Sequence, residues 1–326
     1  MVDVEHREIE VNGLQMHVAE RGEGPLVVLL HGFPESWYSW RHQLGPLADA
    51  GFHAVAPDQR GYGGTSRPEA IDQYSLLHLV GDVVGLIAAL GAERAIVVGH
   101  DWGAPVAWHA ALLRPDVVAG VAGLSVPFTP RMPVSPMAMW REAFGDRFYQ
   151  VYFQEPGVAE RELEADVTET LRRLLIGASG DRPPAPDVER LPSGVLPEGG
   201  GFLDVLRATD DLPGWLTPDD LEFYASEFSR TGFTGGLNWY RNQDRNWELL
   251  APWHGAVVAP PALYVAGARD PVVEFPGMDQ LLLNLRMFVP NLLDSVLLDG
   301  CGHWTQQERP GEVNERLVAF CRDVPA

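Results

Sequence analysis

Lysine is absent from the sequence, and all 24 basic residues are arginine. Without lysine the chain cannot form a Schiff base, a Ser–Lys catalytic pair or the lysine contact of a phosphate-binding P-loop. Basic residues are also in the minority, because 45 acidic residues leave a formal net charge of −21 at pH 7. Such a surface repels phosphate backbones and anionic lipids, so we expect no nucleic-acid partner and no docking on anionic membranes.

Cysteine is scarce, and long apolar runs are missing. The two cysteines, Cys301 and Cys321, have no metal-ligand spacing around them, so we expect free thiols in a reducing, cytoplasmic compartment. We expect neither a metal nor a cofactor. The first residues are charged and lack the apolar stretch of a signal peptide. No apolar run approaches the length of a membrane span, so we expect no stable membrane insertion.

Strand and helix patterns alternate through the first part of the chain. An alternation of apolar and polar residues around Asn12-Gly13 predicts a hairpin over residues 8–18. Buried strands are predicted at residues 26–30, 53–56, 95–98 and 117–126, with helices over residues 74–90 and from about residue 104. This alternation predicts an α/β fold in which a mostly parallel sheet carries helices on both faces.

The alternation breaks after the fourth buried strand. Prolines follow at short intervals, and residues 137–250 read mainly as helices rich in aromatic side chains. Within them, residues 179–201 contain too much proline and glycine for regular structure, and we expect an exposed loop there. Strand patterns then resume. We therefore predict a core made of residues 1–128 and 253–326, interrupted by a helical cap of residues 129–252.

The stretch VVGHDWGAPV, residues 97–106, joins a predicted strand to a predicted helix through a Gly-x-x-x-Gly turn. This is the pattern of a nucleophile elbow, G-x-S-x-G, which raises a catalytic side chain above a sheet. Asp101 stands between Gly99 and Gly103, where serine is usual. A carboxylate suits displacement at saturated carbon, because its attack on a carbonyl would produce an anhydride. Asp101 therefore predicts hydrolysis of a carbon–halogen bond or a strained carbon–oxygen bond through an alkyl ester.

Two further candidate groups follow predicted strands near the C-terminus, Asp270 in GARDP and His303 in GCGHW. Catalytic groups of open α/β sheets gather at the carboxyl ends of strands, in the chain order nucleophile, acid, histidine. Some hydrolases carry the acid one strand earlier, but residues 124–127 contain no carboxylate. Asp299 shares the strand end of His303 and would not face its Nδ1 easily. We therefore expect a triad of Asp101, Asp270 and His303.

The sequence HGFP, residues 31–34, follows another strand and predicts an oxyanion hole. Its expected donors are the backbone N–H groups of Phe33 and Trp102. The leaving group separates the two reactions. A halide needs N–H donors, whereas an epoxide oxygen leaves as an alkoxide and needs an acid such as a tyrosine O–H. Two tyrosine-bearing segments of the cap, residues 147–157 and 237–242, offer such an acid.

Several segments closely resemble soluble epoxide hydrolases of the α/β-hydrolase fold, and together they span nearly the whole chain. They are HGFPESWYSWRHQ (31–43), PDQRGYGGTSRP (57–68), GHDWG (99–103), YFQEPGVAE (152–160), GLNWYRN (236–242) and CGHWTQQERPGEVN (301–314). The resemblance implies that Asp101 is the nucleophile, Asp270 the acid and His303 the base.

The same resemblance implies that Tyr149 and Tyr240 polarise the epoxide oxygen. Tyr152, one helical turn after Tyr149, is the competing assignment. One alternative function is haloalkane dehalogenation, although Phe33 stands where those enzymes usually carry Asn or Glu. A second alternative is a non-catalytic α/β-hydrolase that serves as a ligand receptor.

Aromatic residues near the elbow indicate an apolar substrate tunnel, and we expect Trp102, Phe33 and Trp37 to bind the substrate. The expected partners are therefore a small apolar epoxide and water. A homodimer is also compatible with the sequence. The natural epoxide does not follow from these residues.

Overall fold

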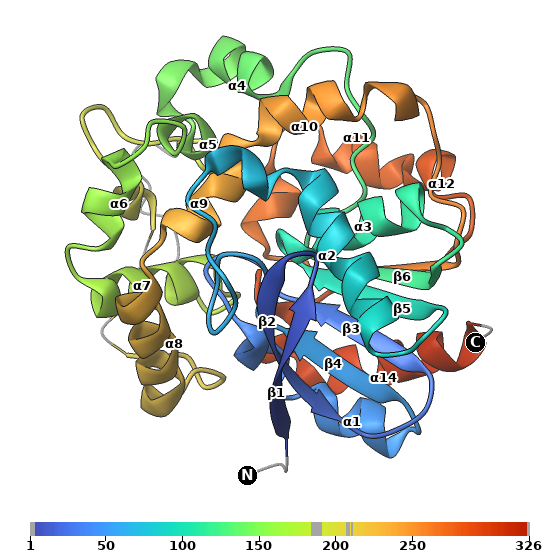
Figure 1. The fold of residues 1–326 in the computed structure, drawn as a ribbon. Helices are drawn as coiled ribbons and strands as arrows, with labels where there is room; N and C mark the ends of the chain where they lie inside the picture. Colours follow the sequence, from blue (N-terminus) through green and yellow to red (C-terminus); the bar gives the residue numbers. More distant parts are fainter. Residues whose placement is uncertain (1–3, 184–190, 207–208, 210, 325–326) are drawn as a thin grey trace.

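One mixed sheet organises the computed structural model, which describes residues 4–183, 191–206, 209 and 211–324 (Figure 1). The strands are β1 (Glu5–Val11), β2 (Leu14–Arg21), β3 (Leu26–Leu30), β4 (His53–Pro57), β5 (Ala95–His100), β6 (Val118–Leu124), β7 (Ala262–Gly267) and β8 (Leu292–Leu298). Their order is β1-β2-β4-β3-β5-β6-β7-β8. Only β2 runs antiparallel to its neighbours, β1 and β4, while the other pairs are parallel. The predicted α/β fold class is confirmed.

The N-terminal hairpin also forms as predicted. Asn12 and Gly13 both take positive φ angles, 49° and 76°, and join β1 to β2 in the turn that matches strand twist. The helix expected over residues 74–90 begins later, at Leu76, because a 3₁₀ turn over Ile71–Tyr74 precedes it.

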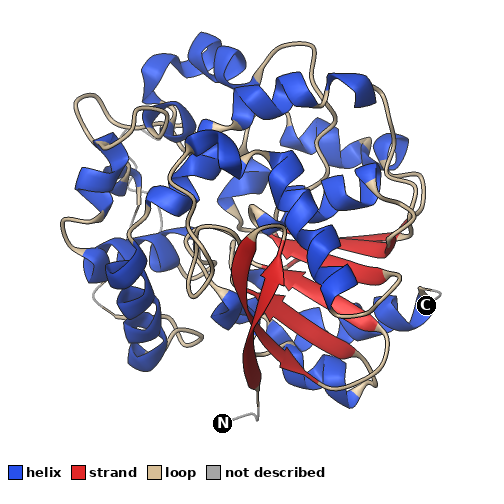
Figure 2. Ribbon diagram, in the orientation of Figure 1, coloured by secondary structure: helices blue, strands red, loops and turns tan. Residues whose placement is uncertain are grey.

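Helices cover both faces of the sheet (Figure 2). They are α1 (Leu44–Asp49), α2 (Leu76–Ala89), α3 (Gly103–Leu113), α4 (Pro136–Phe144), α5 (Tyr149–Tyr152), α6 (Val158–Leu163), α7 (Val167–Ala178), α8 (Pro218–Thr231), α9 (Thr234–Arg241), α10 (Gln243–Leu249), α11 (Met278–Leu283), α12 (Leu285–Phe288), α13 (Thr305–Glu308) and α14 (Pro310–Asp323). Helices α2 and α3 share one buried apolar cluster, and α1 and α14 share a second. Successive side chains of the central strands point alternately into one cluster and the other, so these strands are apolar on both faces.

Helices α4 to α10 are inserted between β6 and β7 and lie mostly above and to the left of the sheet in Figure 1. Trp239 of α9 links this helical segment to the residues after β4, because its Nε1 donates a hydrogen bond to the carbonyl of Arg60 at 3.1 Å. Asn246 of α10 does the same by accepting the N–H of Leu76 at 2.7 Å.

The described parts of residues 179–201 form no helix or strand, as predicted, but they are exposed only in part. Val195 and Leu196 are only 2% and 3% exposed. Val195 forms a bridge with Phe148, and Gly194 accepts the N–H of Tyr149 at 2.9 Å. Apolar side chains among the glycines and prolines anchor this segment to the residues around α5. Residues 184–190 lie outside the described part.

Candidate active site

Asp101 lies in a tight elbow between β5 and α3, with a φ of +50°. Steric contacts explain the glycines on either side. A Cβ on Gly99 would stand 2.0 Å from the carbonyl oxygen of Gly103, and a Cβ on Gly103 would stand 2.1 Å from that of Leu30. The backbone around Asp101 can therefore close this turn only with glycine at both positions, and the turn holds the carboxylate at the carboxyl end of the sheet.

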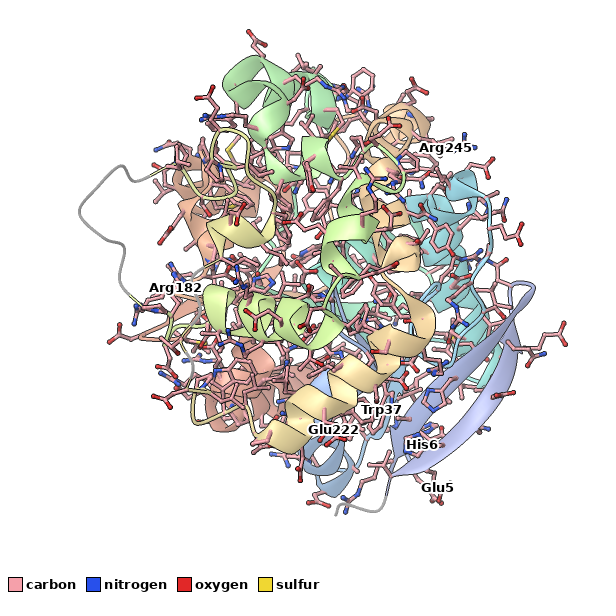
Figure 3. All side chains as sticks on the ribbon, turned by 90° about the vertical axis from the view of Figure 1, so that its left-hand side faces the viewer. Glu5, His6, Trp37, Arg182, Glu222 and Arg245 are labelled. Atoms are coloured by element: carbon pink, nitrogen blue, oxygen red, sulfur yellow. The ribbon has the colours of Figure 1, made fainter. Side chains whose placement is uncertain are left out.

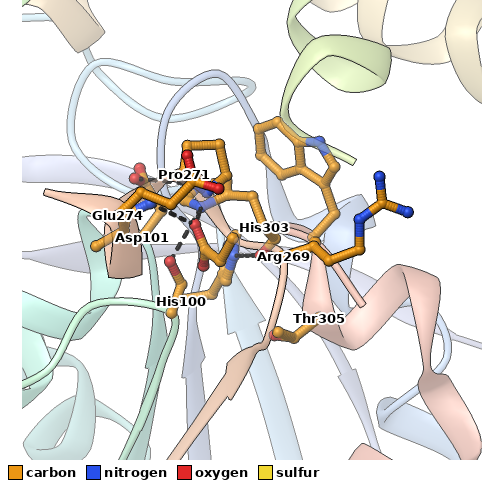
Figure 4. A network of polar contacts seen from close by, with 12 residues as sticks. His100, Asp101, Arg269, Pro271, Glu274, His303 and Thr305 are labelled. Carbon is orange, nitrogen blue, oxygen red and sulfur yellow. Dashed lines mark hydrogen bonds and ion pairs between the residues drawn. The ribbon is translucent and has the colours of Figure 1, made fainter. Parts of the chain in front are cut away.

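His303 lies between two carboxylates that come from different strand ends (Figure 4). Its Nε2 is 3.4 Å from Asp101 Oδ2, and its Nδ1 is 3.0 Å from Asp270 Oδ1. Asp270 is fully buried and His303 is 6% exposed. The backbone N–H of Phe33 donates to the other oxygen of Asp101 at 2.7 Å. The three residues predicted as a triad thus lie together, beside one of the two predicted oxyanion donors; the Trp102 N–H stays a prediction.

The electrostatics of this group favour the ionised forms. Burial acts to lower the pKa of His303, but the neighbouring carboxylates of Asp270 and Asp101 outweigh it and raise that pKa well above its usual range. Burial acts to raise the pKa of Asp101, yet its hydrogen bond and charge contact with His303 leave the pKa lowered. The pKa of Asp270 is lowered for the same reasons. Asp101 is therefore available as a carboxylate, as a nucleophile must be.

A cavity of about 340 Å³ opens above Asp101 and His303, and Tyr149 and Tyr240 line it with them. Most of the remaining wall is apolar and includes Phe33, Leu174, Val195, Phe202, Phe275 and Trp304. The volume falls within the range of small-molecule sites, and an apolar wall with a few convergent polar groups is their usual composition.

The two tyrosines reach the cavity from different helices of the segment between β6 and β7, α5 and α9, and their ring centroids are 6.0 Å apart. Gln150 donates to the hydroxyl oxygen of Tyr149 at 2.9 Å, which leaves the Tyr149 hydroxyl proton free to point elsewhere. Burial raises the pKa of both tyrosines well above the usual value, so both hydroxyls stay protonated. Tyr152, the competing candidate, instead donates to Glu162 at 2.9 Å. The geometry therefore favours Tyr149 over Tyr152.

Two residues predicted to bind substrate, Trp37 and Trp102, are not among the described residues that line this cavity. The ring of Trp37 packs edge-on against His6 and Phe223, and Figure 3 shows it beside His6, far across the view from Arg182, which does line the cavity. The Trp102 ring packs edge-on against Tyr240, with centroids 5.1 Å apart. The cavity lining therefore does not support Trp37 and Trp102 as substrate contacts, and their role stays a prediction. Phe33 does line the cavity.

The chain is similar to known proteins over almost its entire length. A family model described as the alpha/beta hydrolase fold matches residues 25–310. Epoxide hydrolase A of Mycobacterium tuberculosis is 50% identical over 317 residues, which cover 96% of each chain. The chain belongs to the epoxide hydrolase family of the α/β-hydrolase fold. Epoxide hydrolase 3 of Siraitia grosvenorii is 43% identical, over 98% of this chain and 99% of its own. The crystal structure of Epoxide Hydrolase A from Mycobacterium thermoresistibile superposes with a TM-score of 0.92, at 49% identity and 99% coverage of both chains.

In this epoxide hydrolase, three polar residues that sequence reasoning did not place in the site support His303. Ser125, at the end of β6, brings its Oγ to 3.0 Å from His303 Nδ1. His100 lies with its Nε2 2.7 Å from the His303 carbonyl oxygen and its Nδ1 2.9 Å from the buried Glu35. Ser125 occupies the strand end at which some hydrolases carry the acid. This position was the one signal in the sequence that could have placed Ser125 in the site. Glu35 and His100 had none beyond their nearness to HGFP and the elbow.

Among the residues that the structure describes, no group of three or more His, Cys, Asp or Glu side chains is placed to hold a metal ion. Within the same described ranges, no helix is both long enough and apolar enough to cross a membrane.

Proposed function

We propose that the protein converts epoxides to vicinal diols through a covalent ester on Asp101. The observation that carries this proposal is a carboxylate, instead of a hydroxyl, at the elbow of a cavity that also presents two tyrosine hydroxyls. Asp101 attacks one epoxide carbon in line, the carbon–oxygen bond breaks, and an alkyl ester forms. The N–H of Phe33, 2.7 Å from Oδ1, holds the carboxylate in place for this attack.

Ring opening leaves negative charge on the epoxide oxygen, and Tyr149 and Tyr240 are its proton donors. Both hydroxyls are protonated, because burial raises both pKa values. The opening of an epoxide therefore needs the hydroxyl protons of these tyrosines, whereas the release of a halide would need no proton. The phenyl ring of Phe33 offers a halide no N–H donor, which disfavours dehalogenation. The two tyrosines likewise favour an enzyme over a ligand receptor.

His303 acts in the second step, the hydrolysis of the ester. Ester formation removes the charge of Asp101, and with it one of the two carboxylates that raise the pKa of His303. The pKa of His303 therefore falls when the ester forms, and the imidazolium releases the proton that restores the tyrosine hydroxyl. The neutral imidazole can then take a proton from water. Asp270 stabilises the resulting imidazolium, while Phe33 and Trp102 are the proposed N–H donors to the tetrahedral oxyanion. The intermediate then breaks its bond to the substrate oxygen, which takes the proton of the Asp101 carboxyl group. The diol leaves, and Asp101 is restored as a carboxylate.

The proposed substrate is a small apolar epoxide, since the cavity wall is mainly apolar. We propose that residues 129–252 act as the cap and residues 1–128 and 253–326 as the core. The two free cysteines support a cytoplasmic location. For a homodimer, the support is the edge strand β8, whose Leu293 and Leu297 are 53% and 50% exposed.

A single turnover in ¹⁸O-water, with enzyme in excess over a styrene-type epoxide, tests the covalent step. The ester route gives an unlabelled diol and places the label in the Asp101 peptide, because water attacks the ester carbonyl. Direct attack of water on the epoxide gives a labelled diol and an unlabelled peptide. The second pattern would refute the proposed mechanism.

A further inference from the structure

We propose that Glu308 is a positioning residue, which clamps the His303 loop to the cap segment 178–180 and so holds His303 in place for ester hydrolysis. The proposal rests on the proposed function, since it concerns the second half of that reaction. Glu308 ends the short helix α13 and does not itself line the cavity above Asp101. Its hydrogen bonds within the described part of the chain go to backbone N–H groups and not to the side chains of the triad.

The carboxylate of Glu308 accepts three backbone N–H groups, two from the His303 loop and one from the cap. Its Oε2 accepts from Gly302 at 2.9 Å and from Gly180 at 2.8 Å. Its Oε1 accepts from Trp304 at 3.1 Å. One side chain thus fixes the residues before and after His303, and the same side chain is hydrogen-bonded to the cap segment.

The His303 loop and the cap segment touch at the level of the backbone. The N–H of His303 itself donates to the carbonyl of Ala178 at 2.9 Å. A Cβ on Gly302 would stand 2.1 Å from the nitrogen of Gly180, and a Cβ on Gly180 would stand 2.3 Å from the carbonyl oxygen of Gly300. Two glycines therefore allow the approach that places one carboxylate within reach of both segments.

The chemistry of the site calls for a carboxylate in particular. Glu308 is 6% exposed, and its three partners are all donors. An ionised carboxylate offers two acceptor oxygens and no proton, whereas an amide of the same shape would turn its NH₂ group toward at least one backbone N–H. Burial raises the pKa of Glu308, and the N–H groups of Gly302, Gly180 and Trp304 oppose that rise.

Of the groups that react, His303 is the one whose loop Glu308 holds directly. The elbow between β5 and α3 fixes the position of Asp101, and helices α5 and α9 carry the two tyrosines. We therefore expect the loss of the clamp to slow ester hydrolysis while ester formation continues. A displacement of a reacting group by about 1 Å can cost roughly 10²-fold in rate, so slowing of about 10- to 100-fold is expected.

Glu308→Gln is the variant to measure, because it keeps the size of the side chain and removes one acceptor. Single turnovers stopped by acid at millisecond intervals and read by intact mass give the rates at which the ester forms and decays. We expect formation within about threefold of wild type and decay slowed by about 10- to 100-fold. Glu308→Asp serves as the second variant if the glutamine protein does not fold, with the same expected split.

Tyr38→Phe is the matched control, since it removes a different contact between core and cap, the hydrogen bond from Tyr38 to Asp220 at 2.9 Å. Both of its rates should equal those of wild type. Equal slowing of both steps in the Glu308 variant, or of neither, would overturn the clamp. A wild-type enzyme that turns over without any ester would instead overturn the proposed function, so the two failures can be told apart.

Discussion

Replacing Tyr149 or Tyr240 with phenylalanine removes one of the two hydroxyls that donate to the epoxide oxygen in the proposed ring opening. Both rings stay in place after this change, because each is packed against aromatic neighbours, including Phe153 at centroid distances of 5.5 and 5.1 Å. The effect on the rate of ester formation therefore reports the loss of the proton donor and not a collapse of the cavity.

The magnitude follows from the charge that the two hydroxyls meet. A hydrogen bond to a charged group contributes about 1.5–3 kcal/mol, and each 1.4 kcal/mol or so is a factor of ten. Each single variant should form the ester roughly 10- to 150-fold more slowly than wild type. Loss of both donors sums to about 3–6 kcal/mol, or roughly 10²–10⁴-fold, which matches the usual contribution of a general acid.

Rapid-quench single turnovers of Tyr149→Phe, Tyr240→Phe and the double variant provide the assay. Tyr152→Phe is the matched control, because its hydroxyl donates to Glu162 and not into the cavity. It should form the ester within about twofold of wild type, given that surface substitutions usually have small effects. A crippled Tyr152 variant together with a normal Tyr149 variant would refute the assignment of the acid.

Three further predictions concern the histidine, the elbow and pH. His303→Gln should form the ester and stall, so intact-mass spectra after mixing with substrate should show a stoichiometric adduct; free turnover without an adduct would remove His303 from the mechanism. Gly103→Ala should lower the free energy of unfolding by at least about 3 kcal/mol in urea titrations, because its Cβ would meet the Leu30 carbonyl at 2.1 Å, and wild-type stability would contradict the steric argument. The raised pKa of His303 stabilises the fold fully below its unfolded pKa of about 6.5, and this contribution is lost as pH rises through the folded value. Asp270→Asn removes a main cause of that raised pKa, so its unfolding free energy should fall less than that of wild type between pH 6 and pH 9, and equal slopes would contradict the linkage.

The strands, the elbow and the triad were predictable because their causes are local. Apolar runs of five or six residues mark strands buried on both faces, and the spacing of Gly99 and Gly103 marks a turn that admits no side chain there. Parallel strands end at one edge of a sheet, so Asp101, Asp270 and His303 could be expected to meet from their places after strands alone.

The aromatic residues and the proline-rich segment were not predictable in the same way. Whether Trp37 faces the cavity depends on the direction in which the chain leaves the HGFP turn, and its neighbours His6 and Phe223 come from opposite parts of the sequence. Val195 and Leu196 are buried, and Val195 packs in an apolar cluster with Phe148. The proline and glycine content of the whole segment does not reveal a single contact of this kind.

The sequence by itself determined the class of fold and limited the predicted chemistry to displacement at saturated carbon, since the choice of aspartate at the elbow is a property of one position. Tertiary structure alone decided which of two tyrosines one turn apart faces the cavity, because that depends on how the short helix α5 is docked. It also brought Glu308 to Gly180, 128 positions away along the chain. No pattern along the chain encodes such a pair, because the contact exists only once the cap has folded back onto the His303 loop.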